Sequence, residues 1–294
     1  MGDTTSGVTV SHMSSQLDTF AGLAGCACVG SVRAVSSSVR AVGSLGKRPL
    51  RVGATPVPHA EILDFVREPL AAFDIDLQIE IFERFDEPND LLVAGRLHAN
   101  FFQYLPFLDD FNRRTGNGLV PVAPVHIEPF GLYSTTIPEL AAIPDYAEVA
   151  LPSDPVNVDR SLVMLDQLGL IECRPADRGL ANVGDVRSNP RRLVFKELTS
   201  WLLGDMREDF GTGGRSGAGA GVVFLFGNQA MEWGVDTGTA LYCDRGNPAY
   251  AEYLVARPDN CQSSGVRALA EALNCEATRE FITNIYAGQV LAAF

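Results

Sequence analysis

The sequence predicts an α/β fold built on an open sheet, and three observations support this. From residue 50 onward, short apolar segments alternate with segments of helical spacing, and a second series of the same kind begins near residue 149. The chain has 294 residues, 46% hydrophobic and 20% charged, so it can bury a large core in one domain or two lobes. No apolar run reaches the roughly 18 residues that a membrane-spanning helix needs.

The first 49 residues are predicted to be a targeting tail and linker. No acidic residue occurs between Asp18 and Glu61, and small residues dominate, with scattered Arg and Lys. Residues 23–26, Leu-Ala-Gly-Cys, fit a lipobox, whose cysteine takes a diacylglycerol with two anchoring acyl chains. The basic start of a secretory signal is missing. Lipidation at Cys26, an unstructured tail and an Arg/Ser-rich transit segment therefore remain three alternatives.

The first strand-helix series begins at residue 50. We expect strands at residues 50–54, 77–82, 98–100 and 119–125, and helices at residues 58–73 and 88–95. The long first helix is predicted from apolar positions at helical spacing, namely Ile62, Phe65, Val66, Leu70 and Phe73. Residues 126–129 should then lead the chain across to a second lobe.

The second series begins at residue 149. We expect strands at residues 149–151, 193–198 and 222–226, a helix at 157–168 ending before Gly169, and a helical connection at 180–186. Residues 204–221 are rich in glycine, which predicts an exposed flexible loop. This loop lacks the final Gly-Lys-Ser/Thr of a phosphate-binding loop. A strand at 252–256 should return the chain to the first lobe, and helices at 266–273 and 277–286 should close it.

Residues 97–112 hold an unusual mixture of aromatic and amide side chains. Four aromatic residues fall within seven positions, namely Phe101, Phe102, Tyr104 and Phe107. Asn100 and Gln103 lie among them, and Pro106 should interrupt any helix that runs through. The segment could be ordinary core or the wall of a pocket.

Four further segments accompany this one. They are residues 51–62 (Arg-Val-Gly-Ala-Thr-Pro-Val-Pro-His-Ala-Glu-Ile), 126–134 (His-Ile-Glu-Pro-Phe-Gly-Leu-Tyr-Ser), 153–160 (Ser-Asp-Pro-Val-Asn-Val-Asp-Arg) and 226–230 (Phe-Gly-Asn-Gln-Ala). In this order and spacing the five segments resemble the NlpA/MetQ family, the substrate-binding lipoproteins of methionine-type ABC importers. The resemblance covers roughly residues 50–294.

The resemblance implies a two-lobed type II periplasmic-binding-protein fold. The first lobe would hold residues 50–130 plus 252–294, and the second residues 131–251. The ligand would lie in the cleft between the lobes, and hinge closure would bury it.

The resemblance also assigns roles to two polar residues. Arg160 matches the family's arginine on the helix after an Asp-Pro turn, where a guanidinium can bind a ligand carboxylate through two hydrogen bonds. The alternative is a surface ion pair with Asp159 or Asp166. Asn228 matches a family asparagine that bonds the ligand backbone, and its alternative is a plain turn.

Aromatic residues at the family's pocket positions imply an apolar ligand side chain. These positions hold Phe85, Phe102, Tyr104 and Phe107, and a thioether packs well against aromatic rings. Tyr104 stands where the family commonly has His, and Phe85 and Phe107 stand where it commonly has Tyr. The aromatic walls therefore remain while hydroxyl and imidazole groups are lost.

The largest departure follows Pro248. The family typically shows Pro-Tyr followed within two residues by a ligand-contacting Asn, whereas the inserted Ala249 here places Glu252 at that position. A carboxylate could pair with a ligand ammonium but would repel a ligand carboxylate. Asn247 could supply an amide instead if the loop shifts in register.

The net charge of −13 argues against nucleic acid as a partner, because it would repel phosphates. His59, His98 and His126 lie in three separate segments without a partner at metal-ligand spacing, so we expect neither metal nor cofactor. The later cysteines are expected to be buried thiols, although Cys243, Cys261 or Cys275 could pair in an oxidising envelope.

These features together predict a substrate-binding component of an ABC importer, with L-methionine or a related amino acid as ligand. Its expected partners are an ABC permease and ATPase, and a membrane if Cys26 is lipidated. Its expected location is the cell envelope, facing outside the cytoplasm in the periplasm or at the outer surface. One alternative is a non-transport sensor or surface lipoprotein. Another is an enzyme on the same fold, for which no nucleophile-base pair is evident.

Overall fold

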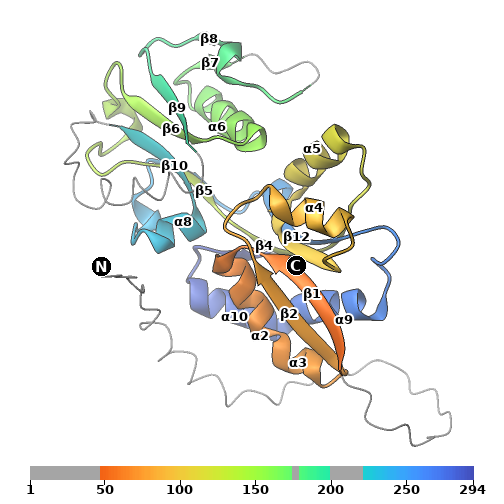
Figure 1. The fold of residues 1–294 in the computed structure, drawn as a ribbon. Helices are drawn as coiled ribbons and strands as arrows, with labels where there is room; N and C mark the ends of the chain where they lie inside the picture. The colour runs from red at the N-terminus through yellow and green to blue at the C-terminus, as the bar shows by residue number, and fades with distance from the viewer. Residues whose placement is uncertain (1–46, 174–178, 199–220) are drawn as a thin grey trace, which may run out of the picture. The chain divides into compact units, whose positions relative to one another are not determined.

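Two β-sheets organise the part of the chain that the computed structural model describes, residues 47–173, 179–198 and 221–294 (Figure 1). The predicted lipidation site Cys26 and nearly all of the predicted loop at 204–221 lie outside these ranges. The described residues belong to one compact unit. None of the helices within them is long and apolar enough to cross a bilayer.

The first sheet has six strands in the order β13-β4-β12-β3-β1-β2. Their bounds are β1 Arg48–Ala54, β2 Ile75–Ile81, β3 Ala99–Tyr104, β4 Val120–Ile127, β12 Ala251–Ala256 and β13 Leu291–Ala292. Strand β1 is parallel to β2 and β3, whereas β12 is antiparallel to β3 and β4. The late strand β12 thus returns the chain to the first sheet, as predicted.

The second sheet has five strands in the order β11-β5-β10-β6-β9. Their bounds are β5 Phe130–Tyr133, β6 Glu148–Pro152, β9 Val194–Leu198, β10 Val222–Phe226 and β11 Tyr242–Asp244. All five residues of β10 are buried, which explains its continuous apolar sequence Val-Val-Phe-Leu-Phe. A separate pair joins β7 (Glu172–Cys173) to β8 (Val186–Ser188).

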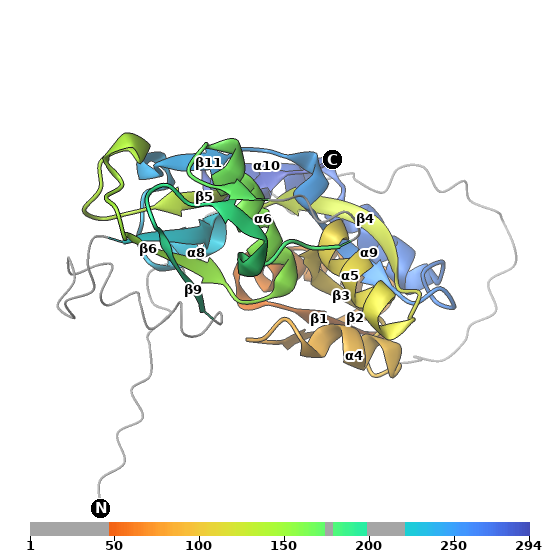
Figure 2. The same ribbon diagram turned by 90° about the horizontal axis from the view of Figure 1, so that it is seen from above.

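Helices cover both faces of the six-stranded sheet (Figures 1 and 2). One face carries η1 (Pro56–Ala60), α2 (Glu61–Phe65), α3 (Arg67–Ala71), α9 (Ser264–Leu273) and α10 (Glu276–Tyr286). The other carries α4 (Glu87–Val93) and α5 (Leu105–Thr115). Apolar residues of both helix layers are buried against the sheet, so burial of these two faces holds the first lobe together.

The five-stranded sheet carries α6 (Pro155–Gln167) and α8 (Gly227–Glu232). Where its connections are described, they contain the 3₁₀ turns η2 (Leu140–Ala142), η3 (Val183–Asp185), η4 (Thr237–Thr239) and η5 (Pro248–Tyr250). Gly227 is required at the start of α8, because a Cβ there would lie 2.2 Å from the backbone oxygen of Gln289. The start of α8 therefore contacts the C-terminal segment at backbone distance.

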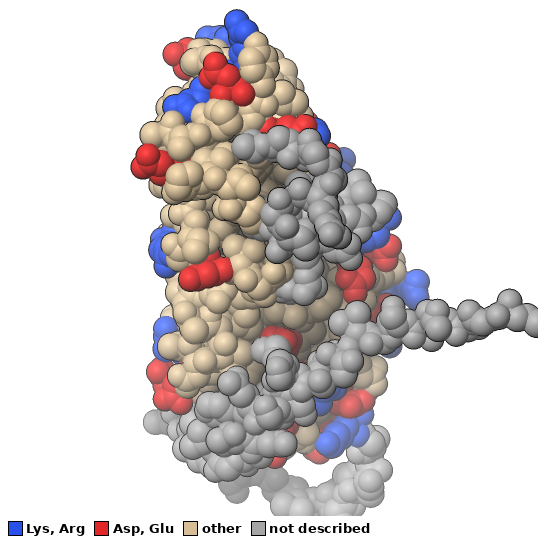
Figure 3. Space-filling model, turned by 90° about the vertical axis from the view of Figure 1, so that its left-hand side faces the viewer, with Lys and Arg blue, Asp and Glu red and all other residues tan. Residues whose placement is uncertain are grey.

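The chain passes between the two sheets twice. Glu128 and Pro129 join β4 to β5 on the way out, and residues 245–250 join β11 to β12 on the way back. The result is the two-lobed α/β fold that the sequence predicted, while the exact lobe boundaries stay a prediction. On the face seen in Figure 3, acidic and basic side chains of the described residues are interspersed.

The single helix predicted at residues 58–73 is wrong. The segment forms η1, α2 and α3, with a break at Val66, whose φ and ψ are −88° and 1°. Pro69 has no N–H to bond the carbonyl of Phe65, and Val57 before Pro58 takes an extended conformation. The helical period survives these breaks because each piece still presents its apolar side to the same core.

Two further predictions around the aromatic segment are corrected. The strand expected at residues 98–100 runs instead from Ala99 to Tyr104, and all six of its residues are buried. Pro106 does not interrupt a helix, because it lies in the first turn of α5, where its missing N–H has no partner to lose. The expected helical connection at 180–186 contains only the turn η3 before strand β8.

Candidate functional site

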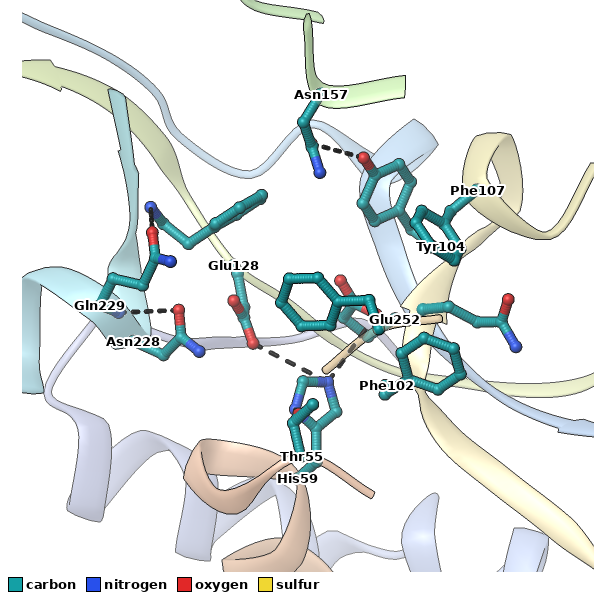
Figure 4. Close-up of a pocket in the computed structure, with 13 residues that line it drawn as sticks. Thr55, His59, Phe102, Tyr104, Phe107, Glu128, Asn157, Asn228, Gln229 and Glu252 are labelled. Carbon is teal, nitrogen blue, oxygen red and sulfur yellow. Dashed lines mark hydrogen bonds and ion pairs between the residues drawn. The ribbon is translucent and has the colours of Figure 1, made fainter. Parts of the chain in front are cut away.

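A pocket lies where β1, β3 and β10 end and α6 and α8 begin (Figure 4). It encloses about 440 Å³, part of which is open to solvent. The residues that line it are Thr55, His59, Phe85, Phe102, Gln103, Tyr104, Phe107, Glu128, Asn157, Phe226, Asn228, Gln229 and Glu252. This position, beyond the carboxyl ends of strands, is where open α/β sheets bind ligands.

One side of the pocket is aromatic. Phe102 stacks near Phe85, with ring centroids 6.5 Å apart and planes 11° apart. Phe107, on α5, meets Phe102 edge-on at 5.8 Å and Tyr104 at 6.3 Å. Strand β3 supplies Phe102 and Tyr104 at alternate positions, so both rings point to the same face of the sheet.

A hydrogen-bonded network of buried amides lies next to the aromatic residues of β3. Gln103 Nε2 donates to Asn89 Oδ1 at 2.6 Å and to Asn100 Oδ1 at 2.9 Å, and Asn89 Nδ2 donates to Gln103 Oε1 at 2.9 Å. Asn100 Nδ2 also donates to Asn89 Oδ1. The two amides that stood out within the aromatic segment therefore hydrogen-bond to each other and to a third amide on α4.

Another part of the pocket is acidic. Glu128 and Glu252 are each about 5% exposed, and the Nε2 atom of His59 lies 3.8 Å from a carboxylate oxygen of each. Burial raises the pKa of Glu252 to about 8, although the Arg160 guanidinium acts in the opposite direction. Burial lowers the pKa of His59 to about 4, against the charge of Glu128, so this imidazole is neutral at pH 7.

Tyr104 connects the two lobes at the edge of the pocket. Its hydroxyl donates to Oδ1 of Asn157 at 2.6 Å, and Asn157 lies in the first turn of α6. Asp154 caps that helix, since its carboxylate accepts from both the backbone N–H and the side-chain amide of Asn157. The cap therefore fixes the amide that Tyr104 reaches.

Asn228 also bridges the two sheets. Its Nδ2 donates to the backbone oxygen of Val57 at 2.9 Å, while its Oδ1 accepts from the N–H of Gln229. Asn228 lies in the first turn of α8, so the alternative of a plain turn does not apply. The predicted binding amide faces the pocket from the second lobe.

Arg160 lies behind the pocket lining, buried to 4% exposure. Its Nη2 donates to Oδ2 of Asp244 at 2.9 Å, and its Cζ lies 3.6 Å from the ring centroid of Tyr250 and 4.5 Å from that of Phe130. The alternative of a surface ion pair with Asp159 or Asp166 is therefore wrong. Among the described residues, Nε of Arg160 is buried without a hydrogen-bond partner, so a donor remains available.

Six of the seven predicted ligand-binding residues line the pocket, namely Phe85, Phe102, Tyr104, Phe107, Asn228 and Glu252. Arg160, the seventh, does not. Asn247 does not line it either, because it caps η5 through the N–H of Ala249. The inserted alanine thus lies in a short turn, and Glu252 takes the pocket position.

The sequence analysis assigned no ligand-binding role to the other lining residues, among them His59, Glu128 and Asn157. A usable signal was present, because Glu128 lies in the predicted crossing and the other two lie at the starts of predicted helices. Cys173, Cys243, Cys261 and Cys275 are free thiols here, so the pairing considered among the last three is not formed. His98 lies apart and accepts from the N–H of Arg51 through its Nδ1.

The fold and the site together define a class of protein: a two-lobed α/β binding protein with its pocket at the crossings between lobes. The chain belongs to the NlpA lipoprotein family, whose family model matches residues 50–294.

Known proteins resemble this chain along most of its length. The membrane lipoprotein TpN32 of Treponema pallidum is 31% identical over 90% of this chain and 96% of its own length. The methionine-binding lipoprotein MetQ of Bacillus subtilis is 30% identical over 84% of this chain and 88% of its own length. The structure of an ABC transporter periplasmic substrate-binding protein from Coxiella burnetii shares 26% identity and a TM-score of 0.73, covering 83% of this chain and all of that one.

Proposed function

We propose that this protein is the receptor of an ABC importer and binds L-methionine, or a closely related amino acid or derivative, in its interlobe pocket. The observation that carries the proposal is the pocket's division into an aromatic wall and an acidic wall, with bridging residues from both lobes. The relatives from Bacillus subtilis and Coxiella burnetii are named as binding proteins, and the proposed role involves binding without a catalytic step. Permease and ATPase subunits are the partners that this role requires.

The ligand side chain would occupy the aromatic side. Phe85, Phe102 and Phe107 present ring faces and edges without a hydroxyl group among them. A thioether gains from contacts with ring edges and leaves no polar group unpaired there. An apolar side chain of similar length would fit for the same reason, which is why the proposal extends to related amino acids.

The ligand ammonium would lie against the acidic side. Glu128 and Glu252 approach His59 from two elements, and the lining includes no Lys or Arg among the described residues. A buried carboxylate is costly to ionise without a cation, as the raised pKa of Glu252 reflects. An ammonium group removes that cost, so binding and ionisation of Glu252 would favour each other.

The ligand carboxylate would be bound by Arg160 and the amides. Arg160 keeps a buried, unpartnered Nε while Asp244 occupies Nη2. Asn157 and Asn228 line the pocket on the same lobe. In this arrangement Asp244 orients the guanidinium from behind the lining. The ligand carboxylate would accept from the two amides and, on reaching past the lining, from Nε of Arg160.

Calorimetric titration of the full chain, unfolded and refolded to remove carried ligand, tests the proposal. The ligands are L-methionine, L-methioninamide, which lacks the carboxylate, and N-acetyl-L-methionine, which lacks the ammonium. L-methionine should bind most tightly, and the acetylated compound should lose about tenfold or more, which corresponds to about 1.4 kcal/mol. Silence with methionine and with a panel of other amino acids contradicts the proposal.

The matched variants are Glu252→Gln and Glu83→Gln. Glu83 is exposed and does not line the pocket, so its variant controls for the change in net charge. Only the first variant should weaken L-methionine binding. Uptake of labelled methionine by cells lacking the gene then tests whether the receptor serves transport or sensing.

A further inference from the structure

Four ligand-type side chains converge at the base of the pocket. His59 comes from η1, His126 from β4, Glu128 from the first crossing and Glu252 from β12. The antiparallel register of β12 and β4 places Glu252 directly opposite His126. The rings of His59 and His126 meet edge-on, with centroids 4.7 Å apart. Tertiary structure alone therefore assembles this group.

The distances within the group match those between the ligands of one metal ion. His126 Nε2 lies 3.2 Å from Glu128 Oε1, and His59 Nε2 lies 3.8 Å from both Glu128 Oε1 and Glu252 Oε2. One ligand atom each from His59, His126 and Glu128 fall within 4.8 Å of one another. Ligand atoms about 2.0–2.1 Å from a tetrahedral ion lie about 3.3 Å apart. The separations of 3.2 and 3.8 Å are within about 0.5 Å of that spacing, and a pair as far apart as 4.8 Å would have to close by about 1.5 Å.

Three atoms of the group have no hydrogen-bond partner among the described residues, although all three are buried. They are Nε2 of His59, Nδ1 of His126 and Oε2 of Glu252. Unpaired buried polar atoms are rare and costly. A cation between Nε2 of His59 and Oε2 of Glu252 would pair two of them at once.

Thr55 holds His59 in the required orientation. Its Oγ1 lies 2.7 Å from Nδ1 of His59, which leaves Nε2 directed toward the two carboxylates. Metal-ligating histidines usually have their second nitrogen fixed by such a partner. His59, Glu128 and Glu252 all line the pocket, so an ion could enter from there.

We propose that His59, His126, Glu128 and Glu252 form a binding site for a divalent first-row transition metal, with Zn²⁺ as the closest chemical match. Two imidazoles and two carboxylates are a donor set suited to Zn²⁺, and its two positive charges balance the two carboxylates. This site goes beyond the proposed receptor function. Because Glu252 serves both, bound metal and a ligand ammonium compete for it.

The test uses the full chain, stripped with a chelator, exchanged into buffer, and then loaded with Zn²⁺ or Co²⁺. Elemental analysis after desalting should find one retained Zn²⁺ per chain, and Co²⁺ should give the visible absorption of a four-coordinate ion. His126→Gln should lower Zn²⁺ affinity by about 100-fold or more, since losing a ligand costs at least as much as losing an outer partner. Glutamine can still donate to Glu128, so the fold should be retained.

His98→Asn is the matched control, because it removes a histidine outside the group while its side-chain oxygen can accept from Arg51. It should retain Zn²⁺ as the unaltered chain does. Zn²⁺ that survives His126→Gln undiminished would place the ion on the thiols or the N-terminal tail and overturn the proposal. Failure of the unaltered chain to retain either ion overturns it too.

The metal site and the receptor function can fail separately. His126 does not line the pocket, so His126→Gln should bind L-methionine normally in chelator-containing buffer. Retention of Zn²⁺ that depends on His126 in a chain silent to methionine supports the metal site and contradicts the receptor function. Methionine binding with no retained metal gives the reverse result.

Discussion

Asp244 accepts hydrogen bonds from the Arg160 guanidinium and from the backbone N–H of Phe130, at 2.9 and 2.8 Å. One carboxylate thus connects α6, β5 and β11 within the second lobe. The bond to Asp244 fixes the orientation of the Arg160 guanidinium. Arg160 therefore has a structural role in addition to its proposed role in binding the ligand.

The first prediction separates these roles by mutation. Arg160→Gln leaves Asp244 without its cation, and losing one partner of a buried pair typically costs about 3–5 kcal/mol. The double variant Arg160→Gln with Asp244→Asn removes both charges and should regain much of that stability, as measured by urea unfolding. Neither the single nor the double variant should bind L-methionine, because both lack the Arg160 guanidinium. Full binding by the double variant would exclude Arg160 as the carboxylate partner.

The second prediction concerns the bond between Tyr104 and Asn157. Tyr104→Phe leaves the buried Oδ1 of Asn157 without its donor, which typically costs about 1–3 kcal/mol. Because the bond connects the lobes, the loss should appear as faster ligand dissociation in stopped-flow measurements. Tyr242→Phe, at an exposed position, is the control and should dissociate at the original rate. Equal rates for both variants contradict a bridging role.

The third prediction tests the buried amides beneath the aromatic wall. Asn89→Ala removes partners of both Asn100 and Gln103. Each buried amide left unpaired costs about 1–3 kcal/mol, so urea unfolding should show a loss in that range. Gln78→Ala removes an exposed amide and should change stability by about 0.5 kcal/mol or less. A similar small effect at Asn89 would mean that water replaces the lost partner.

The fourth prediction is a pH dependence arising from His98. Burial lowers its pKa below the ordinary 6.5, with Arg51 and Arg257 acting in the same direction. The unfolded chain therefore binds this proton more readily, and stability is lost as the pH falls below 6.5. His98→Asn should show a smaller loss of melting temperature between pH 7 and 5 than the unaltered chain. Parallel curves for the two proteins would show that His98 contributes nothing.

The fifth prediction concerns attachment to the membrane. If Cys26 carries a diacylglycerol, Cys26→Ser should move the protein from the detergent phase to the aqueous phase in phase-separation experiments, because both acyl chains are lost. Cys261→Ser, which alters a thiol of the folded part, should leave partitioning unchanged. An unaltered chain found only in the aqueous phase contradicts the lipid anchor.

The sequence predicted what depends on local pattern. Strand β10 was placed at its observed bounds because five consecutive apolar residues, Val222–Phe226, mark a strand buried on both faces. The short strands β5, β11 and β13 were missed, because they are too short to show a period and depend on neighbours distant in the chain. The prediction of a single helix at 58–73 was wrong, because the apolar residues keep their helical spacing across breaks at proline.

The residues of the candidate site also fall into two groups, those that the sequence could predict and those that it could not. Aromatic residues on one strand, such as Phe102 and Tyr104, could be assigned from the sequence because neighbouring positions and a family pattern carry the signal. The relation of Glu252 to His126 could not, because 126 residues separate them and only the antiparallel register of β12 and β4 places them opposite each other. By itself the sequence determined the α/β class, the family and the aromatic wall. Only the tertiary structure decided that Arg160 faces Asp244 and that two histidines meet two carboxylates, since side chains from distant elements meet only when long-range strand pairing is complete.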